Sequence, residues 1–282
     1  MAPVVRRTPN VRQRQLGMAL RTLREEAGLS AEEAGERTGC SQSKITRIEQ
    51  ARIGVGRGDL YLMLETYGVI ERERKEAFWA LALAGRQRGW WTEYKDVIAA
   101  TLGDYIAFES EATTINAWSL GTIHGLLQTE AYARAIFTSA VARSPDEIDL
   151  LVAARMRRQA RLTGSLEFWA ILDESVLSRP IGGPTVLRAQ LDHLLALPPA
   201  VTLQVVPVGT LWHAGLNCAF TLMSFSEYPA VAFVDAVEVD QFVDAPESVA
   251  RYTLTFNRLR AAGANPTESL GMIADARDRI KQ

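Results

Sequence analysis

Cysteine and histidine are scarce in this sequence, which contains two cysteines and three histidines among 282 residues. Cys40 and Cys218 lie far apart, and neither has a partner at the spacing of a metal-binding or redox motif. The histidines add no cluster of metal ligands. We therefore expect two unpaired thiols in a reducing cytoplasm, and neither a metal nor another cofactor.

The sequence also lacks the hydrophobic segments that direct proteins to membranes. No apolar run approaches the roughly 18 residues of a membrane-spanning helix. Residues 1–15 lack the apolar core and the cleavage site of a secretory signal. We expect a cytoplasmic protein without a membrane anchor, and two domains, because 282 residues are long for one.

Motifs for catalysis are missing as well. The segment LDES at residues 172–175 offers two carboxylates and a serine, but no histidine lies nearby in the sequence and no glycine elbow surrounds the serine. The segment GVGRGD at residues 54–59 lacks the Lys-Ser/Thr ending of a phosphate-binding loop and does not follow a predicted strand. We therefore expect no enzymatic activity.

Acidic and basic residues nearly balance over the whole chain, with a net charge of −2, but they do not balance along it. Residues 1–60 hold 11 Lys and Arg against 7 Asp and Glu, a balance of +4, and the remainder holds 20 against 26, a balance of −6. A basic N-terminal part on an acidic body indicates that a polyanionic partner contacts the N-terminal part.

Residues 11–70 have the pattern of a small helical domain. Apolar residues recur at three- and four-residue steps in the first segment, and Ser30 with Glu33 has the signature of a capping box before the second. Ser41 is placed to cap the third segment. We predict helices from Val11 to Gly28, from Ser30 to Gly39, over residues 42–50 and over residues 59–67.

The segments on either side of this domain differ from it and from each other. Residues 1–10 contain two prolines and two arginines without periodicity, so we predict a disordered arm. Residues 71–89 are charged first and apolar later, which is typical of a connecting helix.

Residues 90–282 are predicted to form a larger α+β domain. The part up to residue 163 looks mostly helical, whereas residues 165–240 are rich in Val, Phe and Leu between Pro and Gly signals, which is typical of strands. The expected strands lie in LEFWAILDESVL, VTLQVVPV, AFTLMSFS and VAFVDAVEV, and further helices are expected at residues 186–197, 251–260 and 269–281.

The helix predicted at residues 42–50 has two chemically different faces. At 100° per residue, Ile45 and Ile48 lie about 60° apart and define an apolar face. The opposite face and its flanks are polar: Gln42, Ser43, Lys44, Thr46, Arg47 and Gln50. Two helices joined by a short turn that contains glycine form a helix-turn-helix unit, and its second helix fits the major groove of B-DNA, about 12 Å wide. The polar face is therefore predicted to contact base edges and phosphates.

The segment LGMALRTLREEAGLSAEEAGERTGCSQSKITRIEQAR, residues 16–52, resembles the helix-turn-helix of the Xre family, the group of the lambda and Cro repressors. The resemblance runs through Leu29, Ser30, Gly39, Ser41, Ile45, Ile48 and Glu49. The family often has Gln where this chain has Ala31, and usually Ala where it has Gly35. Glycine at position 35 is expected to lower local helix stability by up to about 1 kcal/mol relative to alanine. The resemblance implies a multidomain protein with an all-α, lambda-repressor-like N-terminal domain.

Segments beyond residue 85 resemble, in order, large regulators of actinobacteria described as antitoxin-like Xre regulators. They include RGWWTEYKDVI, YIAFESEATTINAW, HGLLQTEAYARAIF, ARMRRQARL and ARYTLTFNRLRAAGANPTES. The family usually reads PGLLQTE where this chain has His124 and Gly125. The resemblance implies a transcription regulator with a C-terminal domain of poorly known function, and a small protein partner that is often encoded beside it.

Eight residues are candidates for contact with double-stranded DNA. Gln can bond adenine and Arg can bond guanine bidentately, whereas Ser and Thr adapt to either base. Cations just beyond the helix are expected to contact phosphates, which position the domain without reading sequence. The candidates are Ser30, Gln42, Ser43, Lys44, Thr46, Arg47, Arg52 and Arg57. Arg6, Arg7, Arg12 and Arg14 form either a further arm on the DNA or a disordered tail.

Glu49 is an acidic residue beside a surface that is predicted to face a polyanion. It lies nearer to the apolar face than Arg47 does. We predict that it pairs with Arg24 of the first helix and braces the recognition helix.

A candidate surface for a partner or ligand lies in the C-terminal domain. Arg155, Arg158 and Arg161 on one predicted helix form either a docking surface for an acidic partner or an ion-paired face. Trp118 and Trp169 belong to a group of tryptophans that are expected in core or interdomain packing, or around a ligand pocket: Trp90, Trp91, Trp118, Trp169 and Trp212.

These features together favour a DNA-binding transcription regulator that acts as a homodimer and is controlled by a small protein partner. The general behaviour of such domains predicts half-sites about 34–36 Å apart. Two alternatives remain: the C-terminal domain senses a small molecule, or it is an enzyme that the N-terminal domain tethers to DNA.

Overall fold

The computed structural model describes residues 11–85, 89–140, 143–226, 229–235 and 241–280. The predicted arm at residues 1–10 lies outside the described residues. The chain divides into two compact units, the first comprising Met1–Thr92 with Ala100–Ala107, and the second comprising Glu93–Ala99 with Phe108–Gln282. Each unit buries its own set of apolar side chains.

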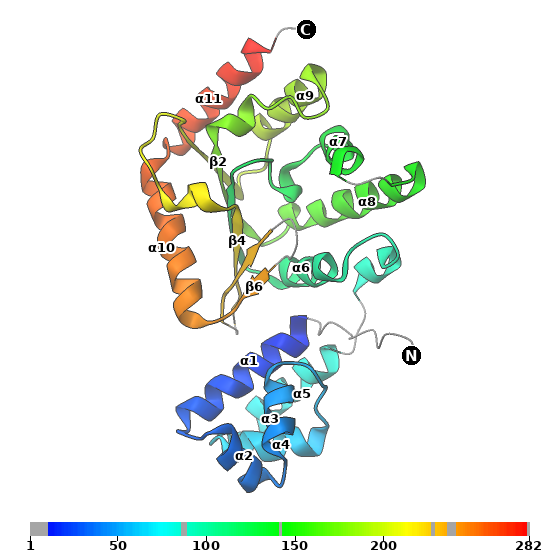
Figure 1. Cartoon of the computed structure of the whole chain (residues 1–282), viewed down its shortest axis with the longest axis vertical. Coiled ribbons are helices and arrows are strands. Elements are labelled where there is room, and N and C mark those ends of the chain that lie inside the picture. Colours follow the sequence, from blue (N-terminus) through cyan, green and yellow to red (C-terminus); the bar gives the residue numbers. More distant parts are fainter. Residues whose placement is uncertain (1–10, 86–88, 141–142, 227–228, 236–240, 281–282) are drawn as a thin grey trace. The chain divides into compact units, whose positions relative to one another are not determined.

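Helices make up the described part of the first unit (Figure 1). They are α1 (Val11–Glu26), α2 (Ala31–Thr38), α3 (Gln42–Glu49), α4 (Arg57–Thr66), α5 (Arg72–Ala84) and part of α6 (Ala100–Glu111). Helix α1 contacts α3, α4 and α5, and α2 contacts α3 and α4. The segment predicted to be a connecting helix thus contains α5, which packs inside the first unit. Leu20, Ile45, Leu60, Met63 and Leu64 have no exposed surface and form the centre of its core.

Local capping signals set the helix ends of the first unit. The Ser30 hydroxyl accepts a hydrogen bond from the backbone of Glu33, and the Glu33 carboxylate accepts one from the backbone of Ser30. Gly39 ends α2 with a φ of 65°, in the left-handed region that glycine adopts without strain. The predicted capping box and the stop at Gly39 are therefore confirmed, and α4 begins at Arg57, two residues before the predicted start.

One six-stranded mixed sheet organises the second unit, in the order β3-β2-β1-β4-β5-β6. The strands are β1 (Thr114–Ser119), β2 (Glu167–Asp173), β3 (Val201–Val206), β4 (Phe220–Ser224), β5 (Val231–Val234) and β6 (Gln241–Val243). Strands β1, β2 and β3 are parallel, and β4, β5 and β6 continue the sheet with antiparallel pairs. The predicted fold class, an all-α domain followed by an α+β domain, is confirmed.

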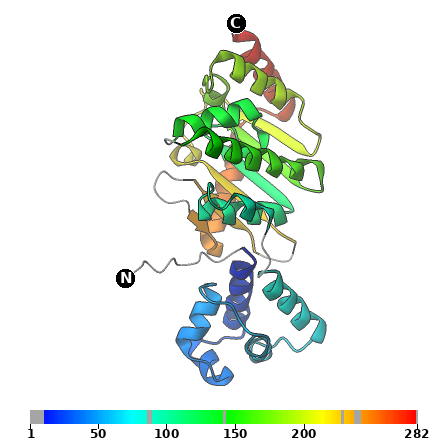
Figure 2. The same cartoon turned by 90° about the vertical axis from the view of Figure 1, so that its right-hand side faces the viewer.

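Helices cover both faces of this sheet. The chain between β1 and β2 forms η2 (Gly125–Leu127), α7 (Glu130–Ala140), α8 (Pro145–Arg158) and η3 (Gln159–Thr163). The chain between β2 and β3 forms η4 (Glu174–Leu177) and α9 (Pro184–Leu195), and η5 (Ala214–Asn217) precedes β4. Helices α7 and α8 lie on one side of the sheet, and α10 (Pro246–Ala262) lies on the other (Figure 1, Figure 2).

Side chains alternate between these two layers, as the pleat of a strand requires. Trp118, Ile171 and Phe220 point to the α10 side, where they pack against Phe256 and Leu259. The residues next to Trp118 in β1 and next to Ile171 in β2 are also buried, so both faces of the sheet are covered at this point.

The outer edge of β3 is closed by the C-terminal part of the chain. The backbone N–H of Val205 donates to the Ser269 hydroxyl in α11 (Pro266–Arg279), at 2.9 Å. The backbone N–H of Ala264 donates to the carbonyl of Val205, also at 2.9 Å. Backbone N–H and C=O groups at this edge therefore have hydrogen-bond partners within the chain. Without such partners, they would offer a template to another strand.

Two strands depart from the sequence analysis. Strand β1 lies at residues 114–119, inside the part predicted to be mostly helical, and that expectation is wrong there. Strand β6 was not foreseen either. No helix among the described residues combines the length and the hydrophobicity that a bilayer crossing demands.

Candidate DNA-binding surface

Helix α3 follows α2 across a turn and exposes one polar face. The Ser41 hydroxyl caps α3 by accepting a hydrogen bond from the backbone N–H of Lys44, at 3.2 Å. Ile45 is fully buried and Ile48 is 2% exposed, so the predicted apolar face packs inside the unit. The side chains on the other face are exposed, and no partner is found for them among the described residues: Gln42, Ser43, Arg47 and Gln50. Thr46 is half-buried between the two faces.

Glycine at position 35 allows the close crossing of α2 and α3. A Cβ atom added to Gly35 would lie 2.7 Å from the carbonyl oxygen of Cys40 and 3.1 Å from the backbone nitrogen of Gln42. An alanine would therefore force the turn to move. The expected cost of glycine concerns the local stability of the helix, and the close crossing adds the opposite preference, because helix propensity does not include this contact.

A second close approach, between α1 and α3, was not recognised in the sequence. A Cβ atom on Gly17 would lie 2.3 Å from the carbonyl oxygen of Glu49. The available signal was a single glycine inside an otherwise regular helical pattern, which often marks close packing. Gly17 thus lets the C-terminal end of α3 rest directly on α1.

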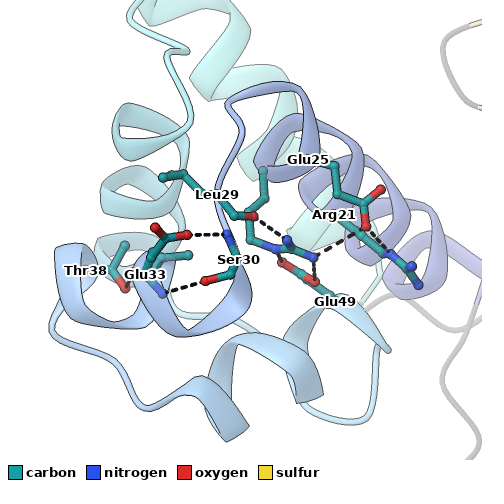
Figure 3. A network of polar contacts seen from close by, with 9 residues as sticks. Arg21, Glu25, Leu29, Ser30, Glu33, Thr38 and Glu49 are labelled. Carbon is teal, nitrogen blue, oxygen red and sulfur yellow. Dashed lines mark hydrogen bonds and ion pairs between the residues drawn. The ribbon is translucent and has the colours of Figure 1, made fainter.

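Arg24 and Glu49 form a buried ion pair between α1 and α3 (Figure 3). Arg24 Nε donates to Glu49 Oε1 at 2.7 Å, and Nη2 donates to Oε2 at 3.0 Å. Arg24 Nη1 also donates to the Leu29 carbonyl at 2.6 Å, just before the capping box of α2. Only 10% and 5% of the two side chains are exposed. The predicted pair is present, and its bracing role stays a prediction.

Two of the cationic candidates for DNA contact form solvent-accessible ion pairs within the unit. Lys44 Nζ lies 2.9 Å from Asp59 Oδ2. Arg57 donates to Glu76 at 2.7 Å and to the Tyr61 hydroxyl at 3.2 Å. Neither cation is therefore freely available, whereas Arg47 is.

The remaining candidates have different positions. Arg52 is exposed after α3, and Ser30 is exposed with its hydroxyl engaged in the capping box. Arg12 and Arg14 belong to α1, so they are not part of a disordered tail, and their contact with DNA stays a prediction. Arg6 and Arg7 lie outside the described residues.

Two family models match the chain, one over each part. The model described as "Helix-turn-helix domain" matches residues 15–78, which hold the surface just described. The model described as "Domain of unknown function (DUF5753)" matches residues 102–275, more than half of the chain. The chain belongs to the DUF5753 family. No curated protein and no solved structure matches it.

The predicted partner surface of the DUF5753 domain is largely engaged inside the protein. Arg158 is 5% exposed and makes two hydrogen bonds to Glu109, at 2.8 and 2.6 Å. Arg155 donates to Gln128 at 2.6 Å, and Arg161 donates to a backbone carbonyl at 2.7 Å. The hypothesis of a cationic docking surface is therefore wrong for Arg158, because its charge is buried against a carboxylate.

The tryptophans of the DUF5753 domain divide into packed and exposed ones. Trp118 is 2% exposed and donates to the carbonyl of Gly215 at 2.7 Å, so it lines no surface. Trp169 lies under the guanidinium of Arg260, 4.0 Å from the ring centroid. Trp212, which was expected in a core, is 76% exposed beside the 87% exposed Leu211. The exposure of this apolar pair could not be predicted from the sequence, because residue type alone indicates burial.

The DUF5753 domain also contains an open groove of about 510 Å³ between α10 and the β5–β6 end of the sheet. Its lining is mainly apolar and includes Pro246, Val249, Ala250 and Leu254, with Asp244 as the charged member. None of the tryptophans lines it, in contrast to the pocket considered from the sequence.

His124 is half-buried at the turn before η2. Its Nδ1 accepts a hydrogen bond from the backbone N–H of Leu126 at 3.3 Å. Burial, assisted by the positive charges of Arg158 and Arg155, lowers the pKa of His124 to about 3. The imidazole is therefore neutral at physiological pH.

The acidic residues at the end of β2 and directly after it accept hydrogen bonds from backbone groups. Asp173 accepts hydrogen bonds from the backbone and hydroxyl groups of Ser175. Glu174 accepts a hydrogen bond from the backbone N–H of Val208 at 2.9 Å. Among the described residues, no group of three or more His, Cys, Asp or Glu side chains is arranged to hold a metal ion.

Proposed function

We propose that this protein is a transcription regulator that inserts α3 into the major groove of DNA. The match to a helix-turn-helix domain indicates a DNA-binding regulator. The observation that carries the finer proposal is the exposed face of α3, where Gln42, Ser43 and Arg47 have no partner among the described residues. Side chains without intramolecular bonds bind base edges without first breaking contacts of their own.

The residues of this face have distinct proposed roles. Gln42 and Arg47 read bases by bidentate hydrogen bonds, and Ser43 adapts to either base. Arg52, exposed just beyond α3, contacts a phosphate and sets the position of the helix. Arg24 and Glu49 hold α3 at its angle to α1 without touching DNA.

The proposed assembly is a cytoplasmic homodimer of the Xre type. Its support is the resemblance of residues 16–52 to that family, whose members place two recognition helices on one face of DNA. Two half-sites would then be separated by about one helical turn, 34–36 Å. The similarity of the later segments to antitoxin-like regulators of actinobacteria supports control by a small protein partner.

The DUF5753 domain is the proposed site of that control. Leu211 and Trp212 support this part of the proposal, since large apolar side chains held in solvent are typical of protein contact sites. The proposal includes no catalytic step, and the use of Asp173 and Glu174 in backbone contacts supports that choice.

Selection of binding sites from random duplexes by the full chain tests the function. We expect enrichment of a two-part sequence, a loss of preference at one position in each half after Gln42→Ala, and uniformly weaker binding after Arg52→Ala. Absence of any enriched sequence would refute sequence-specific binding.

Small-molecule sensing is the second candidate function, and the groove beside α10 favours it. Its volume of about 510 Å³ lies within the usual range of ligand sites, roughly 300–1,000 Å³. A thermal-shift screen of metabolites against the wild type and Ala250→Arg separates the two candidates. A metabolite that stabilises only the wild type supports sensing, and co-purification of a small protein supports partner control.

A further inference from the structure

Asp59 pairs with the recognition helix from a neighbouring helix. Its Oδ2 lies 2.9 Å from Nζ of Lys44, and its Oδ1 accepts the thiol of Cys40 at 3.9 Å. Both side chains of the ion pair are partly open to solvent, with 39% of Lys44 and 37% of Asp59 exposed. The carboxylate thus stands where α3, α4 and the turn before α3 meet.

The N-terminus of α4 favours the negative charge of Asp59 independently of Lys44. Asp59 belongs to the first turn of α4, where unpaired N–H groups and the helix dipole favour a negative charge. The residue that caps α4 is Gly56, which has no side chain to serve these groups. The hydrogen bond to Asp59 raises the pKa of Lys44, so the ammonium keeps its proton. The pair therefore consists of a carboxylate at a helix N-terminus and a protonated lysine bound to it.

This pairing separates Lys44 from the other cations near α3. Arg47 and Arg52 are exposed, and no carboxylate partner is found for them among the described residues. Arg47 lies three residues after Lys44 in α3, where side chains are neighbours on the helix surface, so a duplex in contact with Arg47 lies close to Lys44 and its partner Asp59. At physiological salt, charges interact over about 8 Å. The DNA therefore interacts with Lys44 and Asp59 as a pair, and the net charge of this pair is zero.

Binding to unrelated DNA depends almost entirely on how many phosphates a protein neutralises, whereas recognition of a site adds base contacts. A carboxylate that neutralises one cation weakens the binding to phosphates. It leaves the base contacts of Gln42 and Arg47 in place. We propose that Asp59 is a specificity-determining residue, which neutralises Lys44 and so suppresses binding to DNA of unrelated sequence. This inference rests on the proposed function and adds to it a residue that acts without touching a base.

The test compares Asp59→Asn with Glu65→Gln in the full chain. Glu65 is a matched control, because it also lies in α4 and pairs with a lysine, at 2.7 Å. Its partner Lys75 is only 11% exposed, so loss of Glu65 releases no cation to DNA. Fluorescence anisotropy measures binding to a short duplex of unrelated sequence and to the selected site, between about 50 and 200 mM salt.

We expect Asp59→Asn to steepen the slope of log affinity against log salt by about 0.9, the value for one additional neutralised phosphate. Lowering the salt fourfold then raises the affinity for the unrelated duplex about threefold more than in the wild type. The ratio of specific to unrelated binding falls, and Glu65→Gln changes neither quantity. An unchanged slope in Asp59→Asn would overturn the inference.

The double variant Lys44→Met, Asp59→Asn provides a second readout, because it removes both charges of the pair. Since the pair contributes no net charge in the wild type, we expect the slope of the double variant to equal that of the wild type. A slope flatter by about 0.9 would identify Lys44 as an independent phosphate contact and would overturn the proposal. If the wild type binds neither duplex, the proposed function itself is wrong, and the role of Asp59 fails with it.

Discussion

Replacing Glu49 by alanine is the sharpest test of how α3 is held. The substitution removes the carboxylate that accepts two hydrogen bonds from Arg24, at 2.7 and 3.0 Å. The guanidinium, 10% exposed, then keeps its bond to the Leu29 carbonyl and a contact of 3.6 Å with Glu25. The positive charge of Arg24, which is largely buried, is then left without the carboxylate of Glu49, its main partner.

The expected cost follows from this burial. Removing one partner of a buried, hydrogen-bonded ion pair typically lowers the free energy of unfolding by about 3–5 kcal/mol. Whole domains are stable by only about 5–15 kcal/mol, so the first unit loses a large share of its stability. For a domain of this size, about 3 kcal/mol corresponds to a fall in Tm of at least roughly 12 °C.

Calorimetry of the full chain measures this fall, with circular dichroism to follow the loss of helix. Glu25→Ala is the matched control, because it breaks the exposed pair with Arg21 and should cost less than about 1 kcal/mol. The double variant Arg24→Met, Glu49→Leu should recover much of the loss, since apolar residues can replace both charges.

Two results would refute the reasoning. A free energy of unfolding within about 1 kcal/mol of the wild type for Glu49→Ala would mean that the pair does not hold the unit together. A changed base preference in a site selection, made at a temperature where the variant is folded, would mean that Glu49 reads DNA.

Three further predictions follow from other contacts. Gly17→Ala should lower the free energy of unfolding by about 1–3 kcal/mol in urea titrations, although helix propensity alone predicts a gain, because its Cβ would lie 2.3 Å from the Glu49 carbonyl oxygen. Arg47→Ala should weaken binding to a selected site by about 1–3 kcal/mol in anisotropy titrations and relax preference at one position. His124→Asn should flatten the pH dependence of stability. The folded pKa of about 3 lies below the unfolded value, so the wild type loses stability as pH falls below about 6.5, by roughly 1 kcal/mol per unit. The difference between urea midpoints of wild type and variant at pH 7 and pH 5 measures this effect.

The helices of the first unit could be predicted because their signals are local. Ser30 and Glu33 cap α2 within four residues, and Gly39 ends it. Both ends of the helix are therefore specified by residues that are close together in the sequence. The polar face of α3 follows from periodicity alone once Ile45 and Ile48 are assigned to the core. The pairing of Arg24 with Glu49 could be inferred because a buried carboxylate needs a cation.

Other features depend on partners far away in the sequence. Strand β1 is specified by Phe168 and Met223, which flank Ile115 in the sheet, and neither is visible from residues 114–119. The pairing of Lys44 with Asp59 crosses from one helix to another, so charge at position 44 alone suggested a phosphate contact.

The second unit shows the same limit. The sequence shows the cation of Arg158 but not the buried carboxylate of Glu109 that accepts its hydrogen bonds. Trp212 is exposed in the fold, whereas its residue type alone would predict a buried position.

The central position of β1 has a consequence for how the protein is made. Thr114 pairs with Glu167 on one side and with Ser224 on the other, so its second neighbour is synthesised 224 − 114 = 110 residues later. At about 5–20 residues per second, translation takes roughly 5–20 s to supply it. During that interval the newborn chain carries an apolar strand with an open edge, which can join a strand of another chain. We therefore expect slower translation, which leaves this edge open for longer, to lower the yield of folded protein.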